Sequence, residues 1–352
     1  MKFHLSPEQD ALQDTVLRTL QRVCPPERRR EILESEADFD QALWAALMEL
    51  GIGGLLVGED DGGAGLGLED AAMVFEVLGQ TAAQGPFLGH VLSAWVLASS
   101  GDTALKARWL DRLIAGDAIA ATAFQPGAAD DWSLEVKGGR LSGQVALVPG
   151  ADRAELLVVG VRGGLAVVEA GSAVEVVPVS SSDLTRKLWN VAFTDAPATV
   201  LSSDTLGQRL LDAALVLIAA DALGGAQQCL TLSVDYAKQR EQFGVIIGRF
   251  QALKHQLANM ALEVEPGRAL VWYAAYAWDL DLPDSSRVAA HAKAHLADRF
   301  VSVARGSVQA HGGIGYTWDY DLQIWFRRSM FDRAFLGSPS VHRERAAALA
   351  GW

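Results

Sequence analysis

The stretch from Tyr236 to Gln256 places three side chains of different chemistry close together. Arg240 carries a fixed positive charge, Gln242 an amide and Phe243 a flat apolar ring. A guanidinium binds phosphate oxygens in pairs and a phenyl ring can lie against a heterocycle, so this trio could hold a phosphorylated ligand that contains a ring. The alternative is an ordinary helix junction, in which Arg240 pairs with a neighbouring carboxylate and Phe243 packs in the core.

A second stretch begins at Gln309 and is rich in glycine. Gly312, Gly313 and Gly315 carry no side chains, so a ligand could approach their backbone N–H groups closely. A helix is expected to start near Asp319, and the N-terminus of a helix favours an anion. Taken alone, this stretch is a weak signal of anion binding.

Together the two stretches resemble the acyl-CoA dehydrogenase family. The likeness extends over nearly the whole chain and is looser in its middle third. It rests on three sequence motifs that occur in the family's order and spacing: Tyr236-x-x-x-Arg240-x-Gln242-Phe243-Gly244, Phe250-Gln251-Ala252-x-Lys254-His255 and Gln309-x-x-Gly312-Gly313-x-Gly315-Tyr316. In this family such residues bind the pyrophosphate and adenosine half of an FAD that the opposite subunit holds. The resemblance therefore implies these cofactor-binding residues: Arg240, Gln242, Phe243, Phe250, Gln309, Gly312 and Gly313.

The family uses FAD to desaturate the Cα–Cβ bond of an acyl-CoA thioester. A glutamate removes the α-proton while the flavin takes the β-hydrogen as hydride. The resemblance thus implies an acyl-CoA substrate and an electron-transfer flavoprotein or a similar acceptor. It also implies further subunits, in a homo- or hetero-oligomer that is a dimer or a tetramer.

The family's catalytic glutamate has no counterpart in this chain. Most members carry this glutamate 27 residues beyond the glutamine of the last motif, here Gln309. In this chain that position is Leu336, which Gly337 and Ser338 follow. Other branches carry it ten residues before a glycine that matches Gly224, and that position is Ala214. The catalytic base is therefore left unassigned.

Asp212 and Asp221 lie on the same expected helix as Ala214. A helix turns by about 100° per residue, so neither carboxylate lies both at the height and on the face of Ala214. We interpret both as polar contacts at a helix end or between helices.

The middle of the chain also departs from the family pattern. The family commonly has Glu-Pro-Gly-x-Gly-Ser-Asp where residues 125–131 read QPGAADD, and Trp-Ile-Ser/Thr where residues 145–150 read VALVPG. In the family these segments help to line the flavin site. The residues that would face a neighbour's FAD are thus present, whereas those that would complete this chain's own site are not.

The leading interpretation is the non-catalytic subunit of a heteromeric acyl-CoA dehydrogenase, similar to the α2β2 enzymes that oxidise CoA thioesters of steroid side chains and other bulky acids. Arg240 and Gln309 would then contribute to an FAD site whose glutamate belongs to the partner. Two alternatives stay open. One is a self-sufficient homo-oligomeric dehydrogenase with an unconventional base, and the other is a non-enzymatic scaffold with the family fold.

Composition and net charge indicate which kinds of partner and which cellular compartment are expected. The chain has 352 residues, of which 50% are hydrophobic and 21% charged, as in a globular protein of two or three domains. Its net charge of -13 argues against nucleic acid or an anionic membrane surface as partner, since both need a basic face. Cys24 and Cys229 show no metal-ligand spacing. Without a recognisable signal peptide before the helix start at Ser6, a reducing cytoplasm is the expected compartment.

The hydrophobic pattern predicts the elements that position these residues. Apolar residues at spacings of three and four indicate helices up to about Gly116, among them 39–50 and 69–78. A hairpin around Gly138 and Gly139 and β-branched runs indicate strands, the runs being 156–161, 165–168 and 174–179. Helices return from about Leu206.

The predicted fold is mainly α with a β middle domain, as in acyl-CoA dehydrogenases. It comprises an N-terminal helical domain (1–117), a small β-barrel or sandwich domain (118–202) and a C-terminal four-helix-bundle domain (203–352). An apolar helix near Leu210 to Leu223 carries two aspartates and is too short to span a bilayer, so it is interpreted as a core helix.

Several other groups are interpreted as structural. The glycine-rich segment 57–67 lacks a preceding strand and carries two aspartates before its glycines, so a loop is expected rather than a nucleotide site. His255 and His311 have no second ligand or acid beside them. Arg327 and Arg328 are expected in salt bridges rather than at a CoA phosphate, and the segment 183–186 is expected to cap a turn and to pair across a domain boundary.

Overall fold

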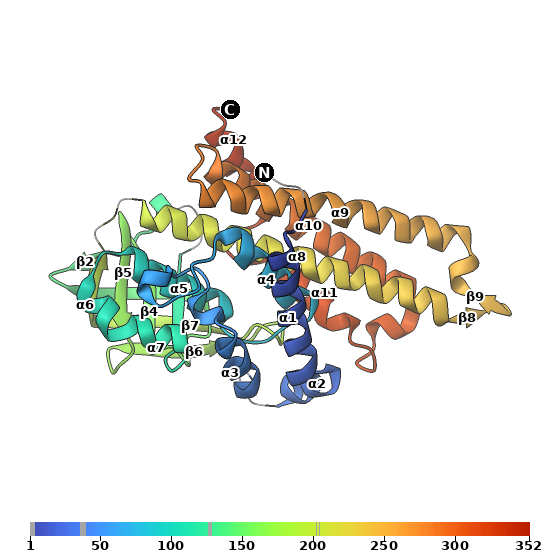
Figure 1. Cartoon of the computed structure of the whole chain (residues 1–352), viewed down its shortest axis with the longest axis horizontal. Helices are drawn as coiled ribbons and strands as arrows, with labels where there is room; N and C mark the ends of the chain where they lie inside the picture. The colour runs from blue at the N-terminus through green and yellow to red at the C-terminus, as the bar shows by residue number, and fades with distance from the viewer. Residues whose placement is uncertain (1–3, 36–39, 126–128, 202, 204) are drawn as a thin grey trace.

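The computed structural model describes residues 4–35, 40–125, 129–201, 203 and 205–352, and it shows the predicted order of helical, β and helical parts (Figure 1). The helices before the sheet are α1 (Pro7–Val23), α2 (Pro26–Glu34), α3 (Gln41–Glu49), α4 (Leu68–Gln80), α5 (Phe87–Ser99), α6 (Thr103–Leu105) and α7 (Asp111–Ala115). Ser6 caps α1 as predicted, because its hydroxyl accepts from the backbone N–H of Gln9. Of the helix predicted at 39–50, Phe39 lies outside the described residues.

The β part is one sheet in which β7 joins two layers. Its strands are β1 (Ala120–Ala123), β2 (Val136–Lys137), β3 (Arg140–Pro149), β4 (Leu156–Val161), β5 (Gly164–Glu169), β6 (Val174–Val179) and β7 (Leu188–Leu201). The order is β1-β4-β5-β7-β3-β2, and β6 also pairs with β7. The start of β7 pairs with β3 and β6 and its end with β5, so this strand passes from one half of the sheet to the other.

The sheet confirms the strands predicted from β-branched runs and the hairpin between β2 and β3. Gly138 and Gly139 both have positive φ, at 57° and 74°, a conformation that a two-residue hairpin turn requires and glycine adopts easily. The parallel pairing of β1 with β4 connects strands far apart in the sequence. Nothing in the hydrophobic pattern indicated that pairing.

Long antiparallel helices form the C-terminal part (Figure 1). They are α8 (Leu206–Gln239), α9 (Gln251–Asp279), α10 (Ser285–His311), α11 (Leu322–Ala334) and α12 (Pro339–Leu349), and the short hairpin of β8 (Glu241–Gln242) and β9 (Val245–Ile246) links α8 to α9. In Figure 1 this hairpin is the tip of the bundle, at the end away from the sheet.

The core position predicted for α8 is confirmed, but its predicted length was wrong. Among the described helices, α8 is long and apolar enough to cross a membrane by length and composition: it has 34 residues, and the mean hydropathy of its most apolar window is 1.5. However, 94% of its most apolar window is buried inside the protein. Burial against neighbouring helices, rather than shortness, is therefore what identifies α8 as a core helix.

The N-terminal helices meet the bundle where α4 crosses α8. A Cβ on Gly224 would lie 1.8 Å from the backbone oxygen of Glu76, and a Cβ on Gly79 would lie 2.0 Å from that of Asp221. Two glycines, one on each helix, thus allow the backbones to approach more closely than any side chain would permit. Substitution of either glycine would force the helices apart.

A buried group of charges, here called the Asp221 network, joins the sheet to the bundle. Asp221 of α8 accepts from the Arg186 guanidinium at 2.8 Å and from Arg328 of α11 through two bonds of 2.8 and 2.9 Å. Arg186 precedes β7, and the adjacent Asp183 accepts from the backbone N–H and hydroxyl of Thr185. This confirms the salt bridge predicted for Arg328 and the turn cap and cross-boundary pair predicted for 183–186. The salt bridge predicted for Arg327 was wrong, because its guanidinium donates to the backbone oxygen of Ser182 at 3.0 Å.

The guanidinium groups decide the charge of Asp221. Burial alone would raise the pKa of this carboxyl, but the positive charges of Arg328 and Arg186 lower the pKa below its usual range. The network is therefore a buried, ionised cluster. Removing Asp221 would leave both guanidinium groups without this counter-ion.

We expect Asp221→Asn to destabilise the protein by about 3–5 kcal/mol, because two buried guanidinium groups would lose their counter-ion. The matched control is Asp14→Asn on α1, whose exposed pair with Arg18 contributes about 0.5 kcal/mol or less. Denaturant unfolding of both variants measures the difference. Equal stability of the two variants would show that the Asp221 network does not hold the two parts together.

His90 of α5 is a second buried polar group that joins elements. Its Nε2 contacts the carbonyl oxygen of Leu113 at 2.9 Å, and its Nδ1 accepts from the backbone N–H of Ala120 at 3.3 Å. These contacts require the neutral ring with its proton on Nε2. Burial lowers the pKa of His90 to about 4.

Because protonation of His90 is easier in the unfolded chain, with a pKa of about 6.5, the protein should lose stability as the pH falls from about 6.5 to 4. The contribution of this ring approaches about 3 kcal/mol at the acid end of that window. His90→Gln should reduce the pH dependence of the unfolding midpoint. His342 titrates in the same window, so part of the dependence should remain. Identical pH profiles for the two proteins would exclude the role of His90.

Candidate functional site

The residues of the first motif lie on the hairpin at the tip of the bundle. Arg240 ends α8 and is exposed, and no ion pair of its side chain occurs among the described residues. Phe243 is 91% exposed, and its ring contacts that of Phe250 edge to face at 6.0 Å. The amide of Gln242 donates to the backbone oxygen of Glu241. The packed helix junction considered from the sequence, with Arg240 paired and Phe243 in the core, therefore does not occur.

The turn of this hairpin places a bulky residue at a position with positive φ. Phe243 has φ 56° and Gly244 φ 76°. Such turns favour asparagine or aspartate before the glycine, because bulky residues are disfavoured at positive φ. The phenyl ring is therefore held out into solvent by a backbone conformation that the residue itself does not favour.

The second motif lies at the same end of the bundle. Gln309 is exposed in the last turn of α10, and Gly312 has φ 66° and ψ -142°, a conformation that is essentially restricted to glycine. A Cβ on Gly312 or Gly313 would meet nothing within 4 Å, so both backbones face open space. The structure thus brings the two motifs to one surface. We call this surface the tip site, defined by Arg240, Gln242, Phe243, Phe250, Gln309, Gly312 and Gly313.

His311 holds the two halves of the tip site together. Its ring stacks on Tyr236 at 4.5 Å between centroids, and its nitrogens contact the backbone oxygen of Ser307 at 2.8 Å and the hydroxyl of Tyr320 at 3.2 Å. The structural interpretation of His311 is confirmed. His255 is exposed near the start of α9.

The helix expected near Asp319 begins later, at Leu322. Asp321 stands at its N-cap position and pairs with Arg29 at 2.9 Å and Arg30 at 2.5 Å. A negative charge of the chain itself therefore already lies beside this helix start, where an external anion was expected.

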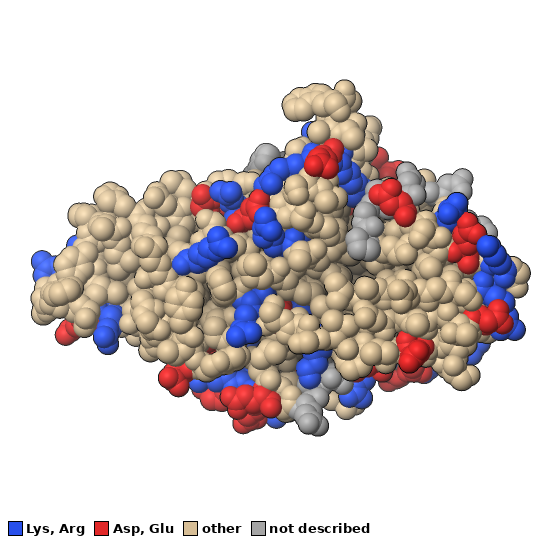
Figure 2. All heavy atoms as spheres, turned by 180° about the vertical axis from the view of Figure 1, so that it is seen from behind, with Lys and Arg blue, Asp and Glu red and all other residues tan. Residues whose placement is uncertain are grey.

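Other large apolar side chains are exposed near the tip site. They lie within the second motif or directly after it, before α11: Ile314, Tyr316 and Trp318. Figure 2, a view from behind, shows few Lys, Arg, Asp and Glu side chains over the half of that face that holds the bundle. Exposed aromatic rings, such as those of Tyr316 and Trp318, are typical of contact with another protein chain.

A pocket of about 220 Å³ lies between the sheet and the end of α11. We call it the sheet pocket. Its lining comes from β1, β3, β7 and α11 with the loop that follows: Thr122, Phe124, Ala146, Leu147, Val148, Pro149, Leu188, Phe331, Ala334, Phe335, Leu336 and Gly337. Leu336 and the segment VALVPG, the positions where this chain departs from the family pattern, thus face one pocket. Residues 126–128 of the other altered segment lie outside the described residues.

No carboxylate lines the sheet pocket among the described residues. Ala214 is fully buried in α8, and Asp212 is bound by Arg345 at 2.7 Å and Ser286 at 2.5 Å. Asp221 belongs to the buried network described above. Neither aspartate is placed as a base for chemistry in this pocket, and their interpretation as interhelical contacts is confirmed.

Sequence reasoning missed a buried polar cluster behind the loop of Leu336. Lys293 of α10 donates to the backbone oxygens of Asp332 at 2.5 Å and Gly337 at 3.4 Å, and His342 Nε2 contacts that of Leu336 at 2.9 Å. Burial lowers the pKa of Lys293 to about 8, while burial and the charge of Asp221 raise the pKa of Asp332 well above its usual range. A lone lysine or histidine in an amphipathic helix gave no signal of this arrangement.

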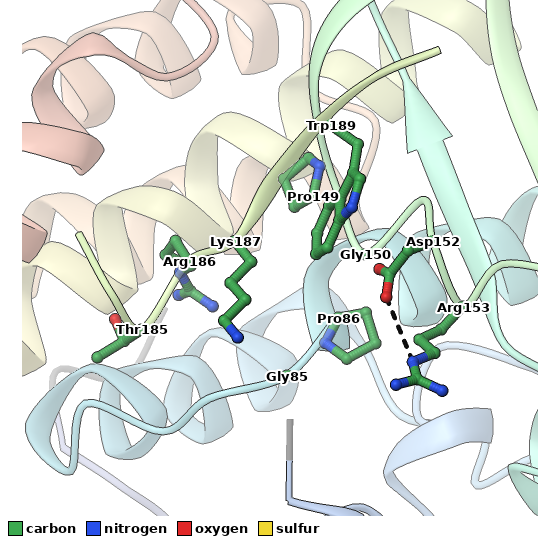
Figure 3. Close-up of a pocket in the computed structure, with 10 residues that line it drawn as sticks. All are labelled: Gly85, Pro86, Pro149, Gly150, Asp152, Arg153, Thr185, Arg186, Lys187 and Trp189. Carbon is green, nitrogen blue, oxygen red and sulfur yellow. Dashed lines mark ion pairs between the residues drawn. The ribbon is translucent and has the colours of Figure 1, made fainter. Parts of the chain in front are cut away.

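A smaller hollow lies where Gly85 and Pro86, before α5, meet the sheet (Figure 3). Arg186 of the Asp221 network lines it, and Arg153 pairs there with Asp152 at 3.3 Å. Its volume is about 20 Å³, room for little more than one water molecule. This hollow cannot hold a cofactor.

The tip site and the sheet pocket differ in what they could bind. The tip site offers a guanidinium without an internal partner and open glycine backbones, which suit a diphosphate that approaches from outside the chain. The sheet pocket offers a single side-chain hydroxyl, that of Thr122, to the polar edge of a flavin ring. The residues present therefore fit the diphosphate of FAD at the tip site and do not fit a flavin ring in the sheet pocket.

Known proteins resemble the chain over its whole length. An acyl-CoA dehydrogenase IpdE2 of Mycolicibacterium smegmatis is 33% identical over 98% of this chain and 99% of its own, and an IpdE2 of Mycobacterium tuberculosis is 32% identical over 94% of each. A solved structure of the Tcur3481-Tcur3483 steroid ACAD has 28% identity and a TM-score of 0.91 over 98% of both chains. The ChsE4-ChsE5 complex of Mycobacterium tuberculosis has 25% identity and a TM-score of 0.90 over 100% of this chain and 99% of that one.

Two family profiles agree with these relatives. Residues 6–117 match the profile of the acyl-CoA dehydrogenase N-terminal domain, and residues 207–350 match that of the C-terminal domain. With the shared fold and a full-length relative above 30% identity, the chain belongs to the acyl-CoA dehydrogenase family.

Proposed function

We propose that this chain is the non-catalytic subunit of a heteromeric acyl-CoA dehydrogenase and that its tip site holds the diphosphate half of an FAD bound in a different, catalytic subunit. The observation that carries the proposal is the exposure of Arg240 and Phe243 at the hairpin that forms the tip of the bundle. FAD supplies the acceptor for the β-hydrogen of an acyl-CoA. The α-proton goes to a carboxylate of the partner, because this chain places none in its own pocket.

The energetics of Phe243 support a contact beyond the chain. Positive φ costs a non-glycine residue about 1–2 kcal/mol, and an exposed phenyl ring forgoes about 1.5–3 kcal/mol of burial. Within the described chain the edge-to-face contact with Phe250 offsets only part of this cost, since the Phe243 ring is still 91% exposed. A ligand or subunit that covers the ring would recover the burial and make use of the strained turn.

The charge of Arg240 supports a phosphate as the group that is bound. The guanidinium can present two parallel N–H donors to diphosphate oxygens, while Gln309 and the backbones of Gly312 and Gly313 face the same surface. Gln242 and Phe250 complete the tip site and would contact the adenosine half. The overall negative charge of the chain keeps other anions away from the remaining surface.

The wider setting follows from the named relatives. The relatives in solved structures include a steroid ACAD and a complex of two different proteins, so we propose a bulky acyl-CoA as the substrate of the assembly and a dimer or tetramer of unlike chains as its form. We further propose an electron-transfer flavoprotein or a similar carrier as acceptor and the cytoplasm as compartment. The division into domains at 117 and 202 stays a prediction.

The proposal is tested by reconstitution with a catalytic family member that carries the glutamate, such as one encoded beside this chain. The assembly should desaturate acyl-CoA, whereas this chain alone should not. In the assembly, Arg240→Ala should weaken FAD binding by about ten- to hundred-fold, the value of a lost charge-assisted contact, and Arg240→Lys should weaken it less. Flavin released on dilution measures both effects.

The matched control is Arg22→Ala, since Arg22 is exposed on α1 and has no ion pair among the described residues. This variant should retain FAD like the unaltered chain. Turnover by the purified single chain would overturn the proposal, and so would unchanged FAD retention by Arg240→Ala.

A further inference from the structure

The sheet pocket has no assigned ligand, and its composition restricts what could enter it. Apart from Thr122 its side chains are hydrocarbon or absent. A charged group would lose its hydration there without gaining a counter-ion, which is strongly unfavourable. An uncharged, mainly hydrocarbon group would instead gain from leaving water.

Among the described residues, Thr122 contributes the one polar side chain of this lining. It lies on β1, is 6% exposed, and its hydroxyl makes no hydrogen bond within the described part of the chain. Buried hydroxyls normally have a partner, because an unsatisfied one is costly. The hydroxyl is therefore available to one oxygen atom of a ligand in the pocket.

The walls of the pocket are held in place under strain. Leu147 on the β3 wall has φ 60°, and Leu336 on the opposite wall has φ 59°. Branched residues adopt such a conformation when the surroundings impose it, and strained positions gather at ligand sites. Lys293 and His342 fix the backbone behind Leu336 through their bonds to Gly337 and Leu336 oxygens. The cavity is thus formed before any ligand arrives.

We propose that the sheet pocket binds a compact alicyclic or branched hydrocarbon group that carries a single uncharged oxygen, which pairs with the Thr122 hydroxyl. This site belongs to the chain itself and is separate from the tip site. It takes the place of a flavin pocket in this subunit. Its occupancy does not require the partner or FAD.

Fluorescence of the uncharged probe N-phenyl-1-naphthylamine, titrated with the purified full chain, tests the site, with small molecules as competitors. 1-Adamantanol should displace the probe, and 1-adamantanecarboxylate should be at least about 100-fold weaker, because its charge cannot be buried there. Thr122→Val should weaken 1-adamantanol by about five-fold and leave 1-methyladamantane unchanged, since only the alcohol can pair with the hydroxyl.

Ala146→Trp places a large ring at the rim of the pocket from an exposed position and should abolish probe binding. Ala104→Trp, at an exposed position of α6 remote from the lining, is the matched control and should bind normally. Unchanged binding to Ala146→Trp would overturn the proposal by placing the probe elsewhere. Equal competition by the carboxylate or by lumiflavin would overturn it by showing a polar site. Because FAD and the partner are absent from this assay, these outcomes are independent of the test of the tip site.

Discussion

The Asp221 network is the interaction on which the arrangement of the molecule depends. One carboxylate on α8 pairs with a guanidinium from the segment before β7 and with another from α11, and all three side chains are buried. Arg186 lies two residues before Leu188 and Arg328 three residues before Phe331, and both of those apolar residues line the sheet pocket. The network therefore sets the distance between the two walls of the pocket. A buried charge pair contributes little to net stability, because its attraction compensates for the lost hydration only when the charged groups are held in good hydrogen-bonding geometry.

The molecule presents two surfaces with opposite chemistry. The tip site has a cation and open backbone, and the sheet pocket has hydrocarbon and one hydroxyl. The described chain has three large apolar residues with positive φ, and all of them lie at these two places: Phe243, Leu147 and Leu336. Ala82, Asp195 and Asp281 also have positive φ, so backbone strain is not confined to these two places, but the bulky residues that adopt it lie there. A subunit that contributes a half-site and has lost its own flavin site would have this distribution.

The sequence predicted what depends on local pattern. The order of helical and β parts, the hairpin at Gly138 and Gly139, and the structural roles of Arg328 and His311 follow from spacing, turn chemistry and the absence of companion ligands. The sequence motifs shared with the family predicted which residues would lie on one surface. Because Tyr236 and His311 stack, the two motifs do lie together at the tip.

What the sequence could not predict depends on contacts between distant segments. The length of α8 was underestimated, because an apolar run does not show how far a helix extends into its polar ends. The sheet pocket draws on β1, β3, β7 and α11, so Thr122 gave no signal until its neighbours were placed. Lys293 and Asp332 read as ordinary helix-surface residues, and only the packing of α10 on α11 shows them to be buried.

Native mass spectrometry of the reconstituted assembly counts FAD against chains and so shows whether this subunit completes the FAD site of its partner. We expect one FAD for each pair of unlike chains and no FAD on this chain when it is alone. One FAD for every chain, or FAD retained by this chain without a partner, would contradict this expectation.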